Sequence, residues 1–84
     1  MTVNNSPETR ARECIVQSVT SINKLTDRDA MEINVETGYS ASTLVSSLGI
    51  IGIKARVMSE DKVIIIGKDE VKKATECPEL LYRP

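Results

Sequence analysis

Histidine and large aromatic residues are missing from this chain, and their absence limits what it can do. Its 84 residues include no His, Phe or Trp, and Tyr39 and Tyr82 are the only aromatic side chains. Without His, the chain lacks the commonest general base near neutral pH, the commonest metal ligand and any phosphohistidine chemistry. Without Phe and Trp, its core must be aliphatic, and a platform for stacking single-stranded bases is weakened.

Cysteine and net charge are also low. Cys14 and Cys77 lack the spacing of a metal site, and we expect two free, buried thiols, with a disulfide between their helices as the alternative. Eleven Lys and Arg against twelve Asp and Glu give a net charge of −1, which argues against strong attraction to nucleic acid or anionic membranes.

No apolar run approaches the roughly 20 residues of a membrane span, and the N-terminus lacks a signal-peptide pattern. We therefore expect a cytoplasmic protein with no metal or other cofactor.

The first half of the chain predicts a long helix and then a half-buried strand. Ser6-Pro7 is typical of a helix start, because Ser6 can cap free N–H groups and Pro7 suits the first helical position. Apolar residues then recur at helical spacing, so we expect this helix to continue to about Leu25. Residues 31–36 alternate between apolar and polar, which is typical of a strand with one buried face.

The second half predicts a helix, a hairpin and a last helix. Ser40 can cap a helix over residues 41–48, with Gly49 as its left-handed C-terminal cap. Alternation over residues 53–58 predicts a strand, and a tight turn leads from it into the apolar run Val63–Ile66. Such a run is typical of a strand covered on both faces or of a central strand. Asp69 can cap a final helix over residues 70–76, which Pro78 ends.

This order of elements predicts one small α+β domain spanning residues 1–84. We expect a two-layer, open-faced sandwich, in which a three- or four-stranded sheet carries two or three helices on one face. A short strand within residues 1–5 would supply the fourth strand, although residues 1–5 and 79–84 are also candidates for flexible tails. The apolar residues 80–82 either pack back onto the domain or meet a partner.

Basic side chains gather in the C-terminal half of the chain. Residues 54–73 contain six Lys and Arg against four Asp and Glu, whereas residues 30–53 carry two Glu and no cation. A basic sheet face could bind phosphates or an acidic partner, and a merely solvated face is the structural alternative. The candidate binding residues on this face are Lys54, Arg56, Lys62 and Lys68.

Three short segments are similar to motifs of one family. Ala11-Arg12 is similar to part of a His-Ala-Arg-Pro motif, Ser47-Leu48-Gly49-Ile50 to the end of a second helix, and residues 61–70 to a last strand and the start of a third helix. Over residues 10–76 the chain thus resembles the histidine-containing phosphocarrier family, HPr. The phosphorylated His would fall at Arg10, and the regulatory Ser is matched loosely by Ser40 or Ser42. The resemblance implies an open-faced sandwich and a regulatory relative without phosphotransfer.

These patterns favour binding over catalysis. No acid, base, nucleophile and metal set converges, so we expect no enzyme and no catalytic residues. We predict a cytoplasmic interaction or regulatory module that binds a protein partner through the exposed sheet face or the residue 80–82 tail. The alternative is a small nucleic-acid-binding domain that uses the basic sheet face. A homodimer is also possible, because an all-aliphatic strand fits a dimer interface as well as it fits a buried core.

Overall fold

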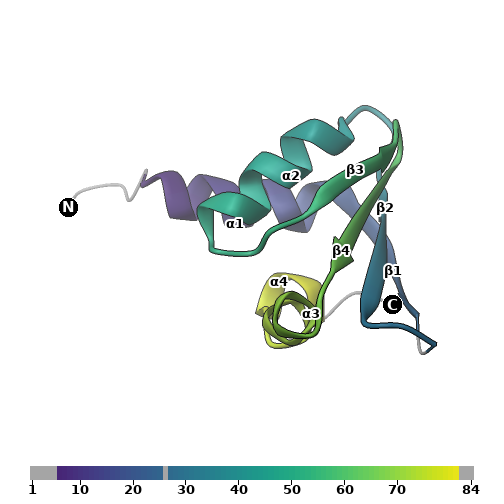
Figure 1. Ribbon diagram of the computed structural model, residues 1–84. Helices are drawn as coiled ribbons and strands as arrows, with labels where there is room; N and C mark the ends of the chain where they lie inside the picture. The colour runs from purple at the N-terminus through teal and green to yellow at the C-terminus, as the bar shows by residue number, and fades with distance from the viewer. Residues whose placement is uncertain (1–5, 26, 82–84) are drawn as a thin grey trace.

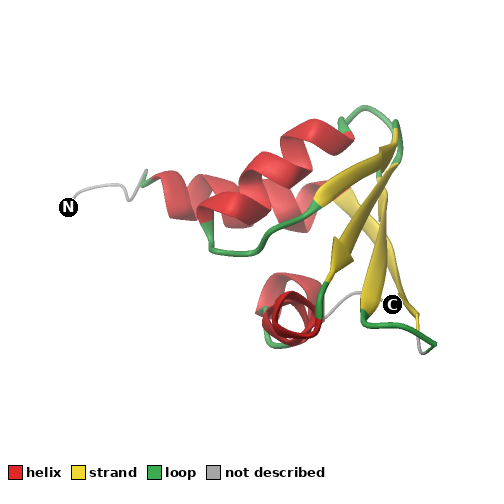
Figure 2. Ribbon diagram, viewed as in Figure 1, coloured by secondary structure: helices red, strands yellow, loops and turns green. Residues whose placement is uncertain are grey.

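A four-stranded antiparallel sheet with helices on one face forms the protein, as Figures 1 and 2 show. The computed structural model describes residues 6–25 and 27–81, so the strand predicted within residues 1–5 lies outside the described residues. The elements are α1 (Pro7–Ser18), β1 (Val19–Leu25), β2 (Ala30–Val35), α2 (Ala41–Ile50), β3 (Arg56–Ser59), β4 (Lys62–Ile66), α3 (Lys68–Thr75) and α4 (Pro78–Leu81). The sheet order is β1-β2-β4-β3, which confirms the predicted open-faced α+β sandwich.

The first helix is shorter than its apolar spacing predicts. It ends at Ser18, and Val19 already has extended dihedral angles of φ −90° and ψ 124°. The continuation of the helix to Leu25 was therefore wrong, because β1 pairs antiparallel with β2 and places Ile22 opposite Ile33. Val, Thr and Ile are β-branched and favour a strand where a partner strand is present. The fourth strand of the sheet thus comes from this segment.

The first two helices begin where the sequence predicts. The hydroxyls of Ser6 and Ser40 each accept a hydrogen bond from the backbone N–H three residues later, at 3.2 Å in both cases. Gly49 was wrongly predicted as a left-handed cap, since α2 continues through it to Ile50. The chain reverses instead at Gly52, whose φ of +93° is one that side-chain-bearing residues rarely adopt.

The last helices also differ from their prediction in detail. Asp69 does not cap α3, because this helix begins at Lys68 directly after Gly67, and no side chain caps it. Pro78 does not merely end a helix: it begins the short helix α4, in keeping with the preference of proline for the first helical position. Leu80 of α4 is 3% exposed. Of the two alternatives for the C-terminal apolar residues, Leu80 therefore packs back onto the domain.

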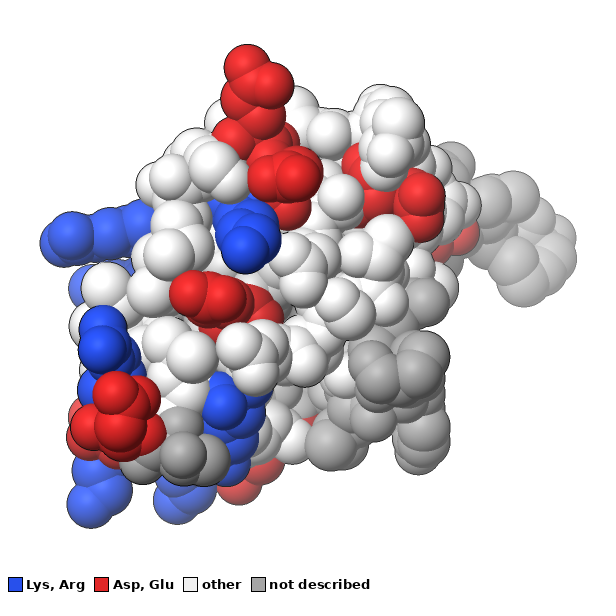
Figure 3. Space-filling model, turned by 90° about the vertical axis from the view of Figure 1, so that its right-hand side faces the viewer, with Lys and Arg blue, Asp and Glu red and all other residues white. Residues whose placement is uncertain are grey.

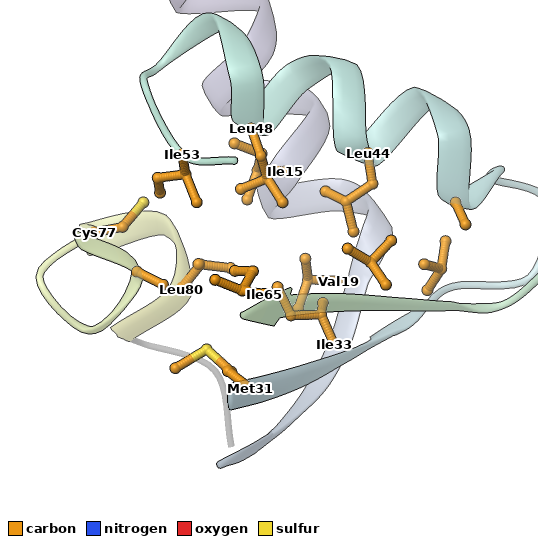
Figure 4. Packing of buried hydrophobic residues seen from close by; sticks show 14 of the residues in the cluster. Ile15, Val19, Met31, Ile33, Leu44, Leu48, Ile53, Ile65, Cys77 and Leu80 are labelled. Carbon is orange, nitrogen blue, oxygen red and sulfur yellow. The ribbon is translucent and has the colours of Figure 1, made fainter. Parts of the chain in front are cut away.

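The core lies between the sheet and the helices (Figure 4). Ile33 of β2 and Val63 and Ile65 of β4 are fully buried, and the strand prediction for residues 31–36 is confirmed in its alternation. From the helical layer, α1 and α2 pack against each other and direct large aliphatic residues at the sheet. Those with no exposed surface are Ile15, Leu44 and Leu48. Every element except the short edge strand β3 contributes to this cluster.

The exposure of two residues differs from what their residue types suggest. Ser47 is a polar residue of α2, yet it is 6% exposed. Its small side chain faces inward, as Ser18 does on α1, in a layer where the two helices pack closely. Val57 pairs with the buried Val63, yet it is 52% exposed, because β3 is a strand of only four residues at the edge of the sheet.

Two neighbouring isoleucines of β4 provide a matched test of this architecture. Ile65 is fully buried and Ile66 is 54% exposed. Substitution Ile65→Ala should lower the free energy of unfolding by about 2–5 kcal/mol, through lost burial and a cavity. Ile66→Ala should cost about 1 kcal/mol or less, because little burial is lost. Urea denaturation measures both values, and equal losses would contradict the assignment of the two faces.

Candidate binding site on the open sheet face

The face of the sheet opposite the helices is open, and Figure 3 views the molecule from that side. Its side chains alternate with the core residues of each strand, so the register brings Glu32 of β2 and Arg56 of β3 to either side of Ile64. Lys and Arg side chains are interspersed with Asp and Glu, with uncharged surface between them (Figure 3). This face therefore has a mixed charge and is not uniformly basic.

Two apolar residues stand on the open face of the central strand β4. Ile64 is half-buried and Ile66 is 54% exposed. The pairing of β3 with β4 reaches Ile64, opposite Arg56, and no β3 residue pairs with Ile66. We call Ile64 and Ile66 the isoleucine seam. It lies between two hollows of about 550 and 380 Å³, and both residues line each of them.

The first hollow lies where β3 gives way to the segment that connects it to α2. It is lined by Val45, Gly49, Ile53, Lys54, Ala55, Arg56, Ile64, Ile66 and Glu70. One oxygen of the Glu70 carboxylate accepts a hydrogen bond from the backbone N–H of Lys54 at 2.8 Å, and the other lies 3.3 Å from Lys73 Nζ. The hydrogen bond from Lys54, aided by Lys73, holds the pKa of Glu70 below its ordinary value. The hollow thus lies at the β3 edge of the sheet, where it reaches residues of α2 and α3, and both apolar and charged side chains line it.

The second hollow lies on the other side of the seam, at the end of β4. It is lined by Arg28, Asp29, Ala30, Ile64, Ile66, Gly67 and Lys68. The backbone N–H of Gly67 donates to the carbonyl of Asp29 at 2.8 Å, which fixes the β1–β2 turn beside the end of β4. Arg28 lies 3.4 Å from the neighbouring Asp27, but both side chains are more than half exposed, so this pair is weak.

The four residues predicted from the sequence are distributed around this seam. Lys54 and Arg56 line the first hollow and Lys68 lines the second, while Lys62 begins β4 on the same face as Ile64. Within residues 6–25 and 27–81, none of the four forms an ion pair. Their side chains are therefore available to an acidic ligand.

Sequence reasoning missed two parts of the site. Arg28 was read as part of a polar connection, and only the β1–β2 hairpin brings it beside Lys68. The seam itself was hidden in the run Val63–Ile66, because four apolar residues in a row do not reveal which of them face outward. The one available signal was that a strand places alternate residues on opposite faces.

A second cluster of polar groups joins α4 to α1. Arg12 Nη1 lies 2.6 Å from Glu79 Oε1, and its Nε lies 3.1 Å from Glu8 Oε2. The Cys77 thiol donates to the same Glu79 oxygen at 3.2 Å. Burial raises the pKa of Glu79, but hydrogen bonds from Cys77, from a backbone N–H and from Arg12 outweigh it, and the pKa lies below the ordinary 4.5. The cluster fastens Leu80 of α4 into the core, which is a structural role.

The described part of the chain holds no grouping of three or more His, Cys, Asp or Glu side chains that could bind a metal ion. Nor does any helix in that part have the length and apolar character needed to cross a membrane. Comparison of the chain with models of protein families, with curated proteins and with solved structures gives no significant match.

From the ion pair between Arg12 and Glu79 we predict that the stability of the protein depends on pH. Because the pKa of Glu79 is lowered in the folded state, its contribution is present above its unfolded pKa and is lost as the pH falls through the lowered value. Glu79→Gln should reduce the free energy of unfolding at pH 7 by about 1 kcal/mol. Chemical denaturation between about pH 7 and pH 3 should show a shallower pH dependence than for the unmodified protein.

The control for this prediction is Glu13→Gln, which removes an exposed carboxylate of α1 that makes no ion pair among the described residues. This variant should keep the pH profile of the unmodified protein. If both variants change the free energy of unfolding equally at every pH, the ion pair between Arg12 and Glu79 makes no specific contribution to stability.

The two cysteines should differ in reactivity. Both are free, with Cys77 6% exposed and Cys14 more accessible. Burial and the hydrogen bond to Glu79 raise the pKa of the Cys77 thiol, so fewer thiolates are present to react. A colorimetric disulfide reagent should therefore modify one thiol per chain rapidly and the second only on unfolding. Cys14→Ser should remove the fast phase, and a fast phase that persists in this variant would refute the assignment.

Proposed function

We propose that this protein is a non-enzymatic interaction module that binds a partner protein through the open face of its sheet. The observation that carries the proposal is the isoleucine seam: two apolar side chains on the open face of a central strand, with a hollow on either side. Binding energy at protein interfaces concentrates where apolar side chains enter well-packed hollows that exclude water. The seam and its two hollows supply such a surface on this protein, and the partner protein would supply the side chains that enter the hollows.

A protein partner is favoured over nucleic acid by the charges around the seam. Glu32 lies beside Ile64 on the open face, and Glu70 and Asp29 line the two hollows. Carboxylates at these positions repel a continuous chain of phosphates, whose binding depends on uncompensated positive charge. Binding of single-stranded bases also gains from aromatic side chains, and among the described residues no aromatic side chain lines either hollow.

A regulatory role in the cytoplasm completes the proposal. It is supported by the resemblance to the HPr family, which stays a prediction. In that resemblance the phosphorylated His would fall at Arg10, which is an exposed residue of α1. A guanidinium group does not accept a phosphoryl group as an imidazole does, so a relative of this kind would act through binding.

The proposed role predicts where peptide ligands bind. Peptides selected from a random library against the folded protein should contact the seam, because such selections favour surfaces with apolar anchoring hollows. Ile66→Ser should weaken their binding at least about ten-fold, which corresponds to about 1.4 kcal/mol. The matched control is Ile50→Ser, since Ile50 is also 54% exposed but lies on α2. Fluorescence anisotropy measures both affinities.

Two outcomes would count against this function. Selected peptides that bind equally well to the Ile66→Ser and Ile50→Ser variants would show that the seam is not the interface. Tight binding of random DNA or RNA oligonucleotides at low salt, with a steep loss as salt is added, would instead support the nucleic-acid alternative.

A further inference from the structure

From this proposed function, on which it rests, we infer the chemistry of the partner: an extended acidic segment that places an apolar side chain on the isoleucine seam. Carboxylates before and after that side chain then reach the cations of the two hollows. The inference follows from the course of the hollows, from the charges that line them, and from the position of Glu32.

The two hollows form one path across the end of the sheet. The first is bounded by α2 and by the segment leading into β3, and the second by the β1–β2 turn and the first residue of α3. Ile64 and Ile66 line both, so the seam is the ridge between them. Volumes of about 550 and 380 Å³ both lie within the range of ligand-binding hollows, roughly 300–1,000 Å³. An extended chain crossing the ridge therefore has room for side chains on both sides.

Each hollow offers two cations against one carboxylate. In the first, Lys54 and Arg56 face Glu70, whose charge is already balanced by Lys73 at 3.3 Å. In the second, Lys68 and Arg28 face Asp29, and Arg28 also makes a weak, exposed ion pair with Asp27 at 3.4 Å. Lys and Arg side chains that are unpaired or only weakly paired form strong, charge-assisted hydrogen bonds with incoming carboxylates. Both ends of the path thus attract negative charge.

The middle of the path rejects negative charge. Glu32 is the cross-strand neighbour of Ile64 on the open face, and it makes no ion pair within the described residues. A carboxylate placed over the seam would meet Glu32 and lose contact with apolar surface, and like charges in contact disfavour a complex. The pattern that fits is therefore acidic, apolar and acidic along the segment. This pattern differs from that of a nucleic-acid strand, which carries a charge at every step.

Four synthetic nine-residue peptides test this pattern directly. Their central residue is Leu and their flanks carry Glu, Gln or Lys, and the fourth peptide has Glu flanks with a central Ser. Affinities are measured by fluorescence anisotropy, and contacts by NMR of the isoleucine methyl groups. The Glu-flanked Leu peptide should shift Ile64 and Ile66 and should bind at least about ten-fold more tightly than the others. Its affinity should fall as salt is added, because exposed charge pairs are screened.

Charge variants locate the attraction. Arg56→Gln and Lys68→Gln, one in each hollow, should each weaken the Glu-flanked peptide about three- to five-fold and leave the Gln-flanked peptide unchanged. The control is Lys72→Gln, an exposed cation of α3 that lines neither hollow, which should have no effect. Equal weakening by all three variants would indicate attraction to net charge alone and would overturn the inferred path.

The outcomes separate this inference from the function on which it rests. If the Gln-flanked peptide binds as tightly as the Glu-flanked one and both shift Ile66, the seam is a binding surface but its partner is not acidic. If the Lys-flanked peptide binds most tightly, the inferred charge pattern is also overturned. If no peptide, including those selected from a library, shifts Ile64 or Ile66, the proposed interaction function itself fails.

Discussion

The pairing of β2 with β4 is the interaction on which the rest of this structure depends. Its register runs from Ala30 opposite Ile66 to Asn34 opposite Lys62. In a chain without Phe or Trp, these two strands supply the centre of an aliphatic core, and α1 and α2 cover them. Because side chains alternate along a strand, the register that buries Ile33 and Ile65 also turns Ile64 and Ile66 outward. A shift of one residue would exchange the core and the candidate interface.

The first hollow beside the seam arises from how the β3 edge is built. Glu70 of α3 binds the backbone N–H of Lys54 at 2.8 Å, and Lys73 donates to the carbonyl of Gly52 at 3.2 Å. These contacts draw the segment before β3 towards α3, so β3 begins only at Arg56 and leaves the end of β4 uncovered. A short edge strand with a register irregularity and a charged residue also disfavours edge-to-edge pairing with other chains. The same contacts thus expose the seam and limit non-specific association through the edge.

Local patterns predicted most of the fold. The caps at Ser6 and Ser40, the alternation of β2 and the turn between β3 and β4 depend on neighbours in sequence, and they were confirmed. The segment Val19–Leu25 was not predicted, because its apolar residues satisfy helical spacing, and only the distant partner β2 decides in favour of a strand.

The residues of the candidate site were likewise predicted only in part. Counting charges identified Lys54, Arg56, Lys62 and Lys68, whereas Arg28 and the outward orientation of Ile66 follow only from strand pairing.

The most direct test of the central claim is the exposure of the isoleucine methyl groups to a soluble paramagnetic gadolinium complex, measured by NMR with and without a bound peptide. In the free protein, the signals of Ile66 and Ile50 should broaden strongly, and those of Ile33 and Ile65 should not, because the latter are fully buried. With peptide bound, Ile66 should become protected while Ile50 stays exposed. Protection of Ile66 in the free protein, or continued broadening of Ile66 in the complex, would contradict the seam as the binding surface.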